Sequence, residues 1–270
     1  MKLLITGSSG FIGKNLVNSL KSIHEIQSYD ILDNQYKRPK DLQINQFDWV
    51  LHIGALSSTA ETNIERVIDL NVSWSIELFE ECLKYGVNFQ WSSSASVYGR
   101  PSETKFSEYL KPNPLNLYAR SKFLLEEYIK NRNADIIWQG FRYFNVYGPG
   151  EEHKGKQASP YHQFKEQAET LGVIKLFENS QLYSRDFVHV SRVCDVHTQM
   201  LEYPKSGIWN IGSGIAKSFE TVANEITEQY DARIEYIKMP SNLESHYQSY
   251  TCADISKLQS VLKTINSEDI

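Results

Sequence analysis

The sequence predicts an α/β fold in which helices cover both faces of a doubly wound parallel sheet, with a smaller α+β lobe interleaved toward the C-terminal half. Three observations carry this prediction. Short apolar runs that suit buried parallel strands alternate with helical stretches. The first run passes directly into a glycine-rich turn and a helix. Two later runs end in small or hydroxyl-bearing residues, at the sheet edge where ligands bind in folds of this class.

Length and composition restrict the class of protein. The 270 residues suffice for one large α/β domain, or for one domain with a smaller lobe, and the mean hydropathy of -0.44 is that of an ordinary globular protein. The net charge of -5 and the pI near 5.8 argue against a general affinity for nucleic acid or anionic membranes. We therefore expect neither nucleic acid nor a membrane as a partner.

Signals for targeting, disulfides and metals are weak. No apolar run approaches the ~18 residues of a membrane span, and the stretch before Gly7 is too short for a secretory signal. Cys82, Cys194 and Cys252 are far apart and odd in number, which favours a reducing compartment, the cytoplasm, over a disulfide framework. The seven histidines are scattered too, so we expect no metal site.

The N-terminal stretch predicts a dinucleotide site. Lys2–Thr6 suits a buried strand, and Gly7, Gly10 and Gly13 form a turn into an amphipathic helix. The glycines permit close approach of a pyrophosphate to the backbone, and the helix N-terminus offers it free N–H groups. Asp30 lies 17 residues after Gly13, at the end of a second strand, where an acidic residue meets the adenosine ribose. A tight turn without a ligand is the alternative.

A short basic segment follows this acidic residue. Lys37 and Arg38 can hold a 2′-phosphate, and a solvated basic loop is an equal alternative. Only 18 residues separate Asp30 from the next core strand, at 49–53, so one strand of the usual nucleotide-binding half is expected to be reduced, to residues 42–44.

Small residues follow the strand at 49–53. The loop at 54–59 includes Ala55 and Leu56 and lies at the ligand-binding edge of the sheet. A long helix is predicted over 61–85, with Asn71 near its middle.

Serines end the next strand, at 88–92. Hydroxyl groups at this carboxyl end, Ser94 among them, can bond a substrate oxygen. The alternative is a serine-rich loop that caps its own backbone.

Tyr118 and Lys122 stand four residues apart on a predicted helix, so their side chains share one face. A tyrosine with a pKa of about 10 is a poor base, but a nearby cation favours the phenolate and can lower that pKa by roughly 1–3 units. The pair can then exchange a proton with a substrate hydroxyl. On its own such a pair is usually an ordinary surface feature.

The second half of the chain interleaves strands and helices. Strands are predicted at 136–142, 185–190 and 208–211, and helices at 160–171, 196–201, 218–230 and 254–262. We expect residues 1–150 to form an NAD(P)-binding domain, and residues 151–270 to form mainly a substrate-binding lobe that interleaves with it.

The glycine loop, Ser94, Tyr118 and Lys122, in this order, resemble the extended short-chain dehydrogenase/reductases that act on nucleotide sugars. The resemblance covers almost the whole chain and implies a Rossmann fold. Within that superfamily the chain is most similar to the ADP-L-glycero-D-manno-heptose 6-epimerases. The stretches that carry this are residues 141–149 (FRYFNVYGP), His153-Lys154-Gly155, residues 175–178, residues 185–188 and Tyr247-Gln248.

The resemblance implies roles for individual residues. Tyr118 is implied as the first proton acceptor, Lys122 as its partner, Ser94 as the hydroxyl that positions substrate and Lys154 as a second acid–base group. The implied cofactor contacts, to NADP with NAD as the alternative, are Gly7, Gly10, Phe11, Ile12, Gly13, Asp30, Lys37, Arg38, Ala55, Leu56, Asn71, Tyr118, Lys122 and Val146. The implied substrate contacts are Ser94, Asn145, Ser159, Phe177, Arg185 and Tyr247.

The implied reaction is a two-stage epimerisation. Tyr118 removes a hydroxyl proton while hydride passes to the cofactor, and hydride then returns to the other face of the ketone. The implied substrate is a nucleotide sugar, ADP-heptose, in lipopolysaccharide core biosynthesis, and we expect a homo-oligomer. The alternatives are a nucleotide-sugar 4-epimerase, a ketosugar reductase and a non-catalytic NADP-binding protein on the same fold.

Three departures from the family pattern bear on this reading. The segment after Asp30 is shorter, which affects the adenine side and the preference for NADP. The stretch at 156–162 has its own sequence, with Lys156 where serine is common. The C-terminus is short, so we expect that the substrate lobe can lack a final helix.

Overall fold

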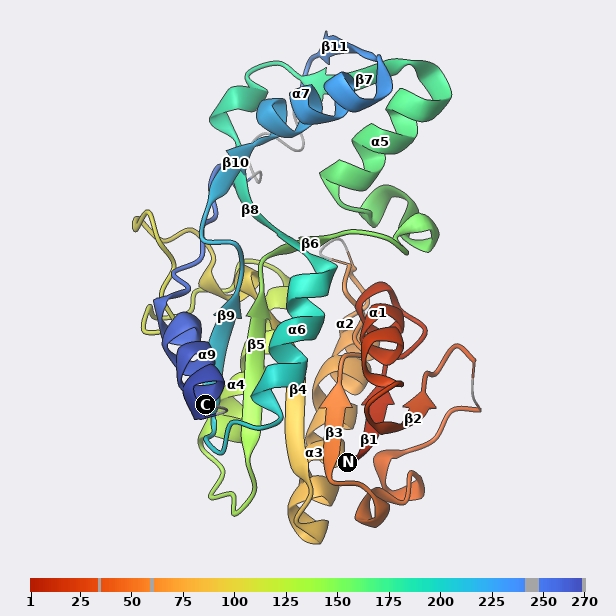
Figure 1. Ribbon diagram of the computed structural model, residues 1–270, viewed down its shortest axis with the longest axis vertical. Helices are drawn as coiled ribbons and strands as arrows, with labels where there is room; N and C mark the ends of the chain where they lie inside the picture. Colours follow the sequence, from red (N-terminus) through yellow and green to blue (C-terminus); the bar gives the residue numbers. More distant parts are fainter. Residues whose placement is uncertain (34, 59–60, 241–247, 269–270) are drawn as a thin grey trace.

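Six parallel strands form the central sheet, in the order β2-β1-β3-β4-β5-β9 (Figure 1). The computed structural model describes residues 1–33, 35–58, 61–240 and 248–268. The strands are β1 (Lys2–Thr6), β2 (Glu25–Tyr29), β3 (Trp49–His52), β4 (Asn88–Ser94), β5 (Trp138–Tyr143) and β9 (Gly207–Ile211). The chain runs outward from β1 to β2 and returns to β3 on the other side of β1, so the strand order reverses between β1 and β3.

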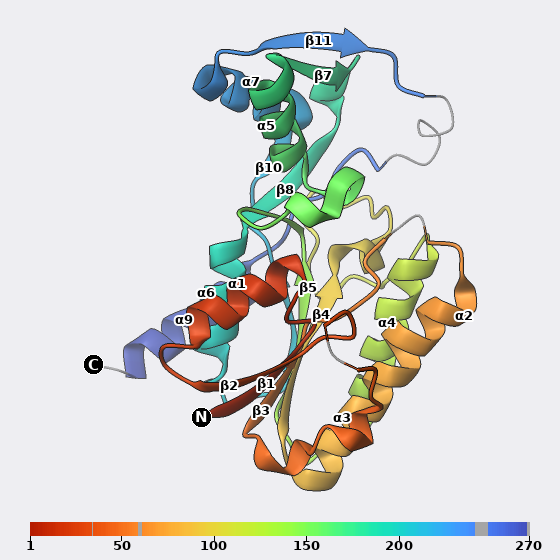
Figure 2. The same ribbon diagram turned by 90° about the vertical axis from the view of Figure 1, so that its right-hand side faces the viewer.

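Helices cover both faces of this sheet, as the sequence predicts (Figure 2). One face carries α1 (Phe11–Leu20), α6 (Val190–Met200) and α9 (Ser256–Glu268), and the other carries α2 (Ile64–Val67), α3 (Trp74–Tyr85) and α4 (Leu117–Lys130). Alternate residues of a strand point to opposite faces. Leu3 and Ile5 therefore pack in the cluster with α1, while Leu4 packs in the cluster with α3. Burial on both faces explains the continuous apolar runs.

The predicted reduced strand at 42–44 is wrong. These residues lie between two short 3₁₀ turns, η1 (Pro39–Asp41) and η2 (Ile44–Gln46), and Gln43 has a left-handed φ of 51° that a strand does not accommodate. Leu42 and Ile44 are still buried, in the cluster that α3 completes. The apolar pattern therefore reports burial correctly, but β2 is left as an edge of the sheet.

The predicted long helix at 61–85 is interrupted. It begins at Ile64, after Asn63 caps the N–H of Arg66, and a π-helical segment, η3 (Ile68–Ser73), separates α2 from α3. Such π segments inside helices are rare and frequent at functional sites.

A smaller α+β lobe lies at the far end of the molecule (Figure 1). It contains α5 (Pro160–Leu171), β7 (Val173–Phe177), α7 (Phe219–Tyr230) and β11 (Arg233–Ile237), with β11 and β7 paired in parallel. A three-stranded sheet, β10-β8-β6, made of β6 (Asn145–Tyr147), β8 (Ser184–His189) and β10 (Ala216–Ser218), lies between lobe and main sheet.

The lobe is interleaved with the main sheet, as predicted. After β8 the chain returns to the sheet as α6 and β9, then goes back to the lobe as β10 and α7. Helix α6 begins at Val190, six residues before the predicted helix at 196–201. Within the ranges that the structure describes, no helix is long and apolar enough to cross a membrane.

Candidate active site

A cavity of about 380 Å³ opens at the carboxyl ends of β1 and β3, where the strand order reverses. This is the place where ligands bind in open α/β sheets. Eleven of the residues singled out from the sequence line it: Gly7, Gly10, Phe11, Ile12, Gly13, Asp30, Ala55, Leu56, Tyr118, Lys122 and Lys154. The fold thus brings the glycine loop, the acidic residue and the tyrosine–lysine pair to one place, although Gly7 and Lys122 lie 115 residues apart in the sequence.

Sequence reasoning missed other residues of the same cavity. They include Thr6, Tyr29, Ile31, Leu32, His52, Arg66, Leu70, Trp74, Tyr143 and His153. Thr6, His52 and Tyr143 end strands β1, β3 and β5, so their places at strand ends could have revealed them. Arg66, Leu70 and Trp74 come from the helix predicted over 61–85. The sequence carried no signal for the interruption of that helix.

The glycine loop is shaped by contact between backbones. A Cβ on Gly7, whose φ is +73°, would lie 2.3 Å from Cα of Gly54, and one on Gly13 would lie 2.0 Å from the carbonyl oxygen of Gly7. At Gly10 the nearest atom to such a Cβ is 3.4 Å away. Gly10 is also the N-cap of α1 and brings no side chain to the N–H groups of the first turn. These features fit a pyrophosphate held by the helix N-terminus.

Asp30 is poised for a ribose rather than for a phosphate. Its carboxylate is buried and accepts hydrogen bonds from the N–H groups of Ser9 (3.1 Å) and Leu32 (2.9 Å). These bonds place a negative charge on the wall of the cavity, beside the glycine loop. A carboxylate in this position accepts from ribose hydroxyls and repels a 2′-phosphate.

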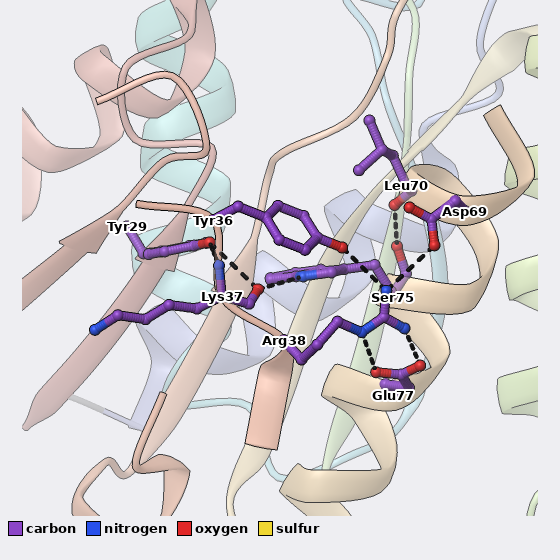
Figure 3. A network of polar contacts seen from close by, with 9 residues as sticks. Tyr29, Tyr36, Lys37, Arg38, Asp69, Leu70, Ser75 and Glu77 are labelled. Atoms are coloured by element: carbon purple, nitrogen blue, oxygen red, sulfur yellow. Dashed lines mark hydrogen bonds and ion pairs between the residues drawn. The ribbon is translucent and has the colours of Figure 1, made fainter. Parts of the chain in front are cut away.

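Arg38 does not line the cavity, because its guanidinium is bound elsewhere (Figure 3). Its Nε donates to Glu77 over 2.9 Å and its Nη1 donates to Asp69 over 3.2 Å and to the Tyr36 hydroxyl over 3.0 Å. Its Nη2 also binds Glu77. The Glu77 hydrogen bond raises the pKa of Arg38. The predicted phosphate ligand is thus an anchor to α3 and η3.

Lys37 acts through its backbone. Its N–H donates to the Tyr29 hydroxyl over 2.9 Å, and its carbonyl accepts from Trp74 Nε1 over 3.0 Å. Tyr29 and Trp74 line the cavity and stack 6.0 Å apart. The short segment after Asp30 therefore braces the cavity wall, while the Lys37 side chain points away from the Arg38 network (Figure 3).

Asn71 supports the cavity wall through hydrogen bonds to residues around it. In the π segment, its Oδ1 accepts from the N–H of Leu56 (2.8 Å) and its Nδ2 donates to the carbonyl of Leu56 (3.0 Å) and to Ser121 Oγ (3.0 Å). Asn71 does not itself line the cavity. It joins the loop after β3 to helix α4, which carries Tyr118.

Lys122 is buried in the cavity wall, and Tyr118 beside it is half-buried. Lys122 Nζ lies 6.0 Å from the centre of the Tyr118 ring and donates to the carbonyl (2.8 Å) and Oγ (3.2 Å) of Ser92. Burial lowers the pKa of Lys122 to about 7. Burial also raises the pKa of Tyr118, against a smaller opposing effect of its hydrogen bond with Ser94. The expected lowering of the tyrosine pKa by lysine is therefore not found in this ligand-free structure.

A buried ion pair fixes helix α4 beneath this pair. Glu126 binds Arg142 of β5 through two hydrogen bonds, of 3.0 Å and 2.5 Å, and accepts a third from Ser93 of β4. Both charged side chains are almost fully buried. Removing one partner of such a pair leaves an uncompensated buried charge. Tyr118 and Lys122 thus sit on a helix that is firmly attached to two strands.

His52 is a brace and not an acid–base group. Its Nδ1 lies 2.6 Å from Thr6 Oγ1, and its Nε2 lies 2.8 Å from Ser75 Oγ. Burial lowers the pKa of His52 to about 3, so the ring is neutral near pH 7. In the part of the chain that the structure describes, no group of three or more His, Cys, Asp or Glu residues could hold a metal ion.

Lys154 reaches the cavity from the side opposite helix α4. It belongs to η5 (Glu152–Gln157), and its Nζ lies 4.9 Å from the centre of the Phe11 ring at the start of α1. Helices α1 and α4 lie on opposite faces of the sheet (Figure 2). The ammonium is paired with Glu151 at 2.9 Å.

The remaining candidates lie outside this cavity. Asn145 and Val146 are in β6, Ser159 caps α5, Phe177 ends β7, and Arg185 in β8 binds the carbonyls of Ser184 and Gln248 and lies over the Phe219 ring. Ser94 is adjacent, through its bond with Tyr118. Tyr247 lies outside the described residues. Strands β6 and β8, which carry Asn145, Val146 and Arg185, run between the main sheet and the lobe (Figure 1).

Substitutions at two glycines should distinguish an effect on dinucleotide binding from an effect on stability. We expect Gly10→Val to abolish dinucleotide binding with little loss of stability, because its side chain meets space reserved for the ligand. Gly13→Ala should instead destabilise the fold, since its Cβ would lie 2.0 Å from a backbone oxygen. Thermal unfolding and fluorescence titration with NADH and NADPH measure both effects. Unchanged affinity in Gly10→Val would make the loop a structural turn.

Lys122 should make stability depend on pH. With a pKa near 7 in the folded state and 10.5 unfolded, the unfolded chain binds more protons between these values, so stability rises with pH across that window. The slope is at most ~1.4 kcal/mol per pH unit. Denaturant unfolding of the ligand-free protein and of Lys122→Met tests this. We expect Lys122→Met to have a higher free energy of unfolding than wild type near pH 7, and this difference should shrink as pH rises. A difference that stays constant with pH would contradict the lowered pKa of Lys122.

Comparison with known proteins agrees with this geometry. The chain is similar to the structure of Helicobacter pylori ADP-L-glycero-D-manno-heptose-6-epimerase, with 27% identity, a TM-score of 0.85, and coverage of 97% of this chain and 90% of that chain. MoeE5 in complex with UDP-glucose and NAD matches with 26% identity, a TM-score of 0.83, and coverage of 97% and 92%.

A third structure supports the fold alone. The UDP-N-acetylglucosamine 4-epimerase from Methanobrevibacter ruminantium M1, in complex with UDP-N-acetylmuramic acid, has 22% identity, a TM-score of 0.87, and coverage of 96% of this chain and 91% of that chain. The model of the NAD-dependent epimerase/dehydratase family matches residues 3–212. With its glycine loop, its tyrosine–lysine pair and this match over most of its length, the chain belongs to the NAD-dependent epimerase/dehydratase family.

Proposed function

We propose that this protein is a nucleotide-sugar epimerase that oxidises and re-reduces its substrate with a bound nicotinamide cofactor. One observation carries the proposal: Tyr118 of α4 and Lys154, which lies over Phe11 of α1, line the same cavity as the glycine loop, and α4 and α1 cover opposite faces of the sheet. Residues 1–150 hold the cofactor, and residues 151–270 contribute mainly to substrate binding. The protein works in the cytoplasm as a homo-oligomer.

Residues of this chain hold the cofactor, position the substrate and transfer protons. Gly7, Gly10, Gly13 and the first turn of α1 hold the pyrophosphate, and Asp30 accepts from the adenosine ribose. The nicotinamide, when bound, supplies the hydride acceptor and donor. Tyr118, aligned by Ser94, takes the proton of the substrate hydroxyl.

Proton transfer on the other face requires a second group. When hydride returns to the opposite face of the ketone, the oxygen no longer points at Tyr118. Lys154 stands over Phe11, on the α1 side of the cavity, and gives the proton there. A reductase that works on one face has no use for this second group, so its presence favours epimerisation.

We propose an ADP-heptose as substrate, in lipopolysaccharide core biosynthesis, with Asn145, Ser159, Phe177, Arg185 and Tyr247 as contacts. The His153-Lys154-Gly155 sequence and the similarity to the Helicobacter pylori heptose epimerase support this choice. A 4-epimerase that acts on a UDP-sugar is the second candidate, and MoeE5, which is about as similar to this chain, is in complex with UDP-glucose. Incubation with ADP-, GDP- and UDP-sugars, followed by NMR of the products, decides between them.

Loss of an acid–base group should lower kcat, whereas loss of a substrate contact should mainly raise KM. We expect Tyr118→Phe and Lys154→Ala each to keep the fold and cofactor affinity and to lower kcat by ~10²–10⁴-fold with little change in KM. Following each epimer separately by NMR measures the loss. A Lys154→Ala enzyme that equilibrates both epimers at near-normal kcat would exclude the two-base mechanism, and a change confined to KM would make Lys154 a phosphate ligand.

We also propose NAD rather than NADP as the preferred cofactor. Asp30 repels a 2′-phosphate, and Arg38, the expected counter-charge, is bound to Glu77 and Asp69 (Figure 3). The family description and the NAD in the MoeE5 structure support this preference.

Dissociation constants at low salt test the cofactor preference. We expect NAD to bind at least roughly tenfold more tightly than NADP, a difference of about 1.4 kcal/mol. Asp30→Ala should reduce this difference in affinity between NAD and NADP. Arg38→Ala should weaken both cofactors to a similar degree, because it loosens the cavity wall. A selective loss of NADP in Arg38→Ala would instead show that Arg38 leaves Glu77 to bind the 2′-phosphate.

A further inference from the structure

Glu151 is a fully buried carboxylate in a glycine-rich segment. It lies in the turn between β6 and α5 and is 0% exposed. Three glycines of this turn have positive φ values, Gly148 (143°), Gly150 (98°) and Gly155 (50°). Glycine loses more conformational freedom on folding than any other residue, so such a turn needs strong contacts to remain in one shape.

The carboxylate of Glu151 provides those contacts. Its Oε1 accepts from the N–H of Gly148 (3.2 Å) and from Ser159 Oγ (2.7 Å). Its Oε2 accepts from the N–H of Ser159 (2.7 Å) and from Lys154 Nζ (2.9 Å). All four partners are donors, which fits an ionised carboxylate, since that group only accepts.

Lys154 is the one cation among these four partners. A buried charge without a partner costs several kcal/mol, and Lys154 supplies the opposite charge for this carboxylate. Lys154 is 23% exposed, lies beside Phe11 and lines the cavity. The ammonium is therefore held between a buried negative charge and the space where substrate and cofactor meet.

The same carboxylate reaches the smaller lobe. Ser159 is the N-cap of α5, and its Oγ accepts from the N–H of His162 over 3.2 Å while it donates to Glu151. Glu151 thus joins three parts: the end of β6, the lysine at the cavity and the first turn of α5.

We propose that Glu151 is a positioning residue for the reaction, acting through Lys154: its carboxylate holds the lysine side chain at the cavity and sets its place relative to the smaller lobe. This inference rests on the proposed role of Lys154. In one turnover the phenolate of Tyr118 takes the hydroxyl proton of the substrate as hydride leaves the carbon for the nicotinamide, and Lys154 gives a proton to the carbonyl oxygen of the ketone as that hydride returns. Tyr118 then releases its proton to solvent and Lys154 regains one, so the protons balance.

A double-mutant cycle tests whether Glu151 acts through Lys154. The four enzymes are wild type, Glu151→Gln, Lys154→Ala and the double variant, assayed with the sugar nucleotide that the ADP-, GDP- and UDP-sugar panel shows to be turned over. We expect Glu151→Gln to lower kcat at least ~10-fold and to change KM less than ~3-fold. In the Lys154→Ala background the same substitution should cause less than ~2-fold further loss, because its route of action is gone.

Glu152→Gln is the matched control. It makes the same chemical change one residue away, at an exposed carboxylate, and should leave kcat unchanged. Cofactor affinity and thermal unfolding are measured for every variant. If Glu151→Gln does not fold, Glu151→Asp, which keeps the charge on a shorter side chain, goes through the same cycle.

The outcomes separate this inference from the proposed function. Equal losses of kcat in the wild-type and Lys154→Ala backgrounds would overturn it, since Glu151 would then act on the fold alone. A wild-type kcat in Glu151→Gln would overturn it as well. A Lys154→Ala enzyme with normal epimerisation would instead remove the proposed role of Lys154 itself, whatever Glu151→Gln does.

Discussion

The close approach of two backbone segments, after β1 and after β3, is the constraint on which the rest of this structure depends. Thr6 accepts hydrogen bonds from the N–H groups of Ile53 and Gly54, and Gly7 fits against Gly54 only because neither has a side chain. This close approach holds the glycine loop and the N-terminus of α1 beside the loop after β3, and both line the cavity. Asp30, Tyr118 and Lys154 reach the same cavity from three other parts of the chain.

Burial changes the pKa values of the ionisable groups in the cavity wall. Burial disfavours the charged forms of Lys122 and Tyr118 and moves their pKa values apart: the pKa of the lysine falls to about 7, and that of the tyrosine rises from its usual value of 10. Nearby, the charges that remain are compensated locally. Glu126 pairs with Arg142, and Glu151 with Lys154. The site therefore combines a tyrosine and a lysine whose charged forms are disfavoured by burial with ion pairs that are held in fixed positions.

Local sequence patterns predicted much of the fold and of the cavity. The period of apolar residues placed the strands of the sheet, and the four-residue spacing of Tyr118 and Lys122 placed both side chains in the cavity, because a helix fixes that geometry. Pairing over long distances in the sequence was not predictable. Arg38 finds Glu77 39 residues away, and no local signal distinguishes that partner from a phosphate. The left-handed Gln43 and the π segment around Asn71 depend likewise on tertiary contacts.

The central claim is that epimerisation proceeds by hydride transfer to a bound cofactor and back to the same carbon. The most direct measurement is NMR of the epimer formed from a turned-over sugar nucleotide in D₂O, with purified enzyme and no added reductant. The account predicts that the inverted carbon keeps its original hydrogen, because that hydrogen never mixes with solvent. Deuterium at the inverted carbon would show proton abstraction from carbon instead, and would contradict the account.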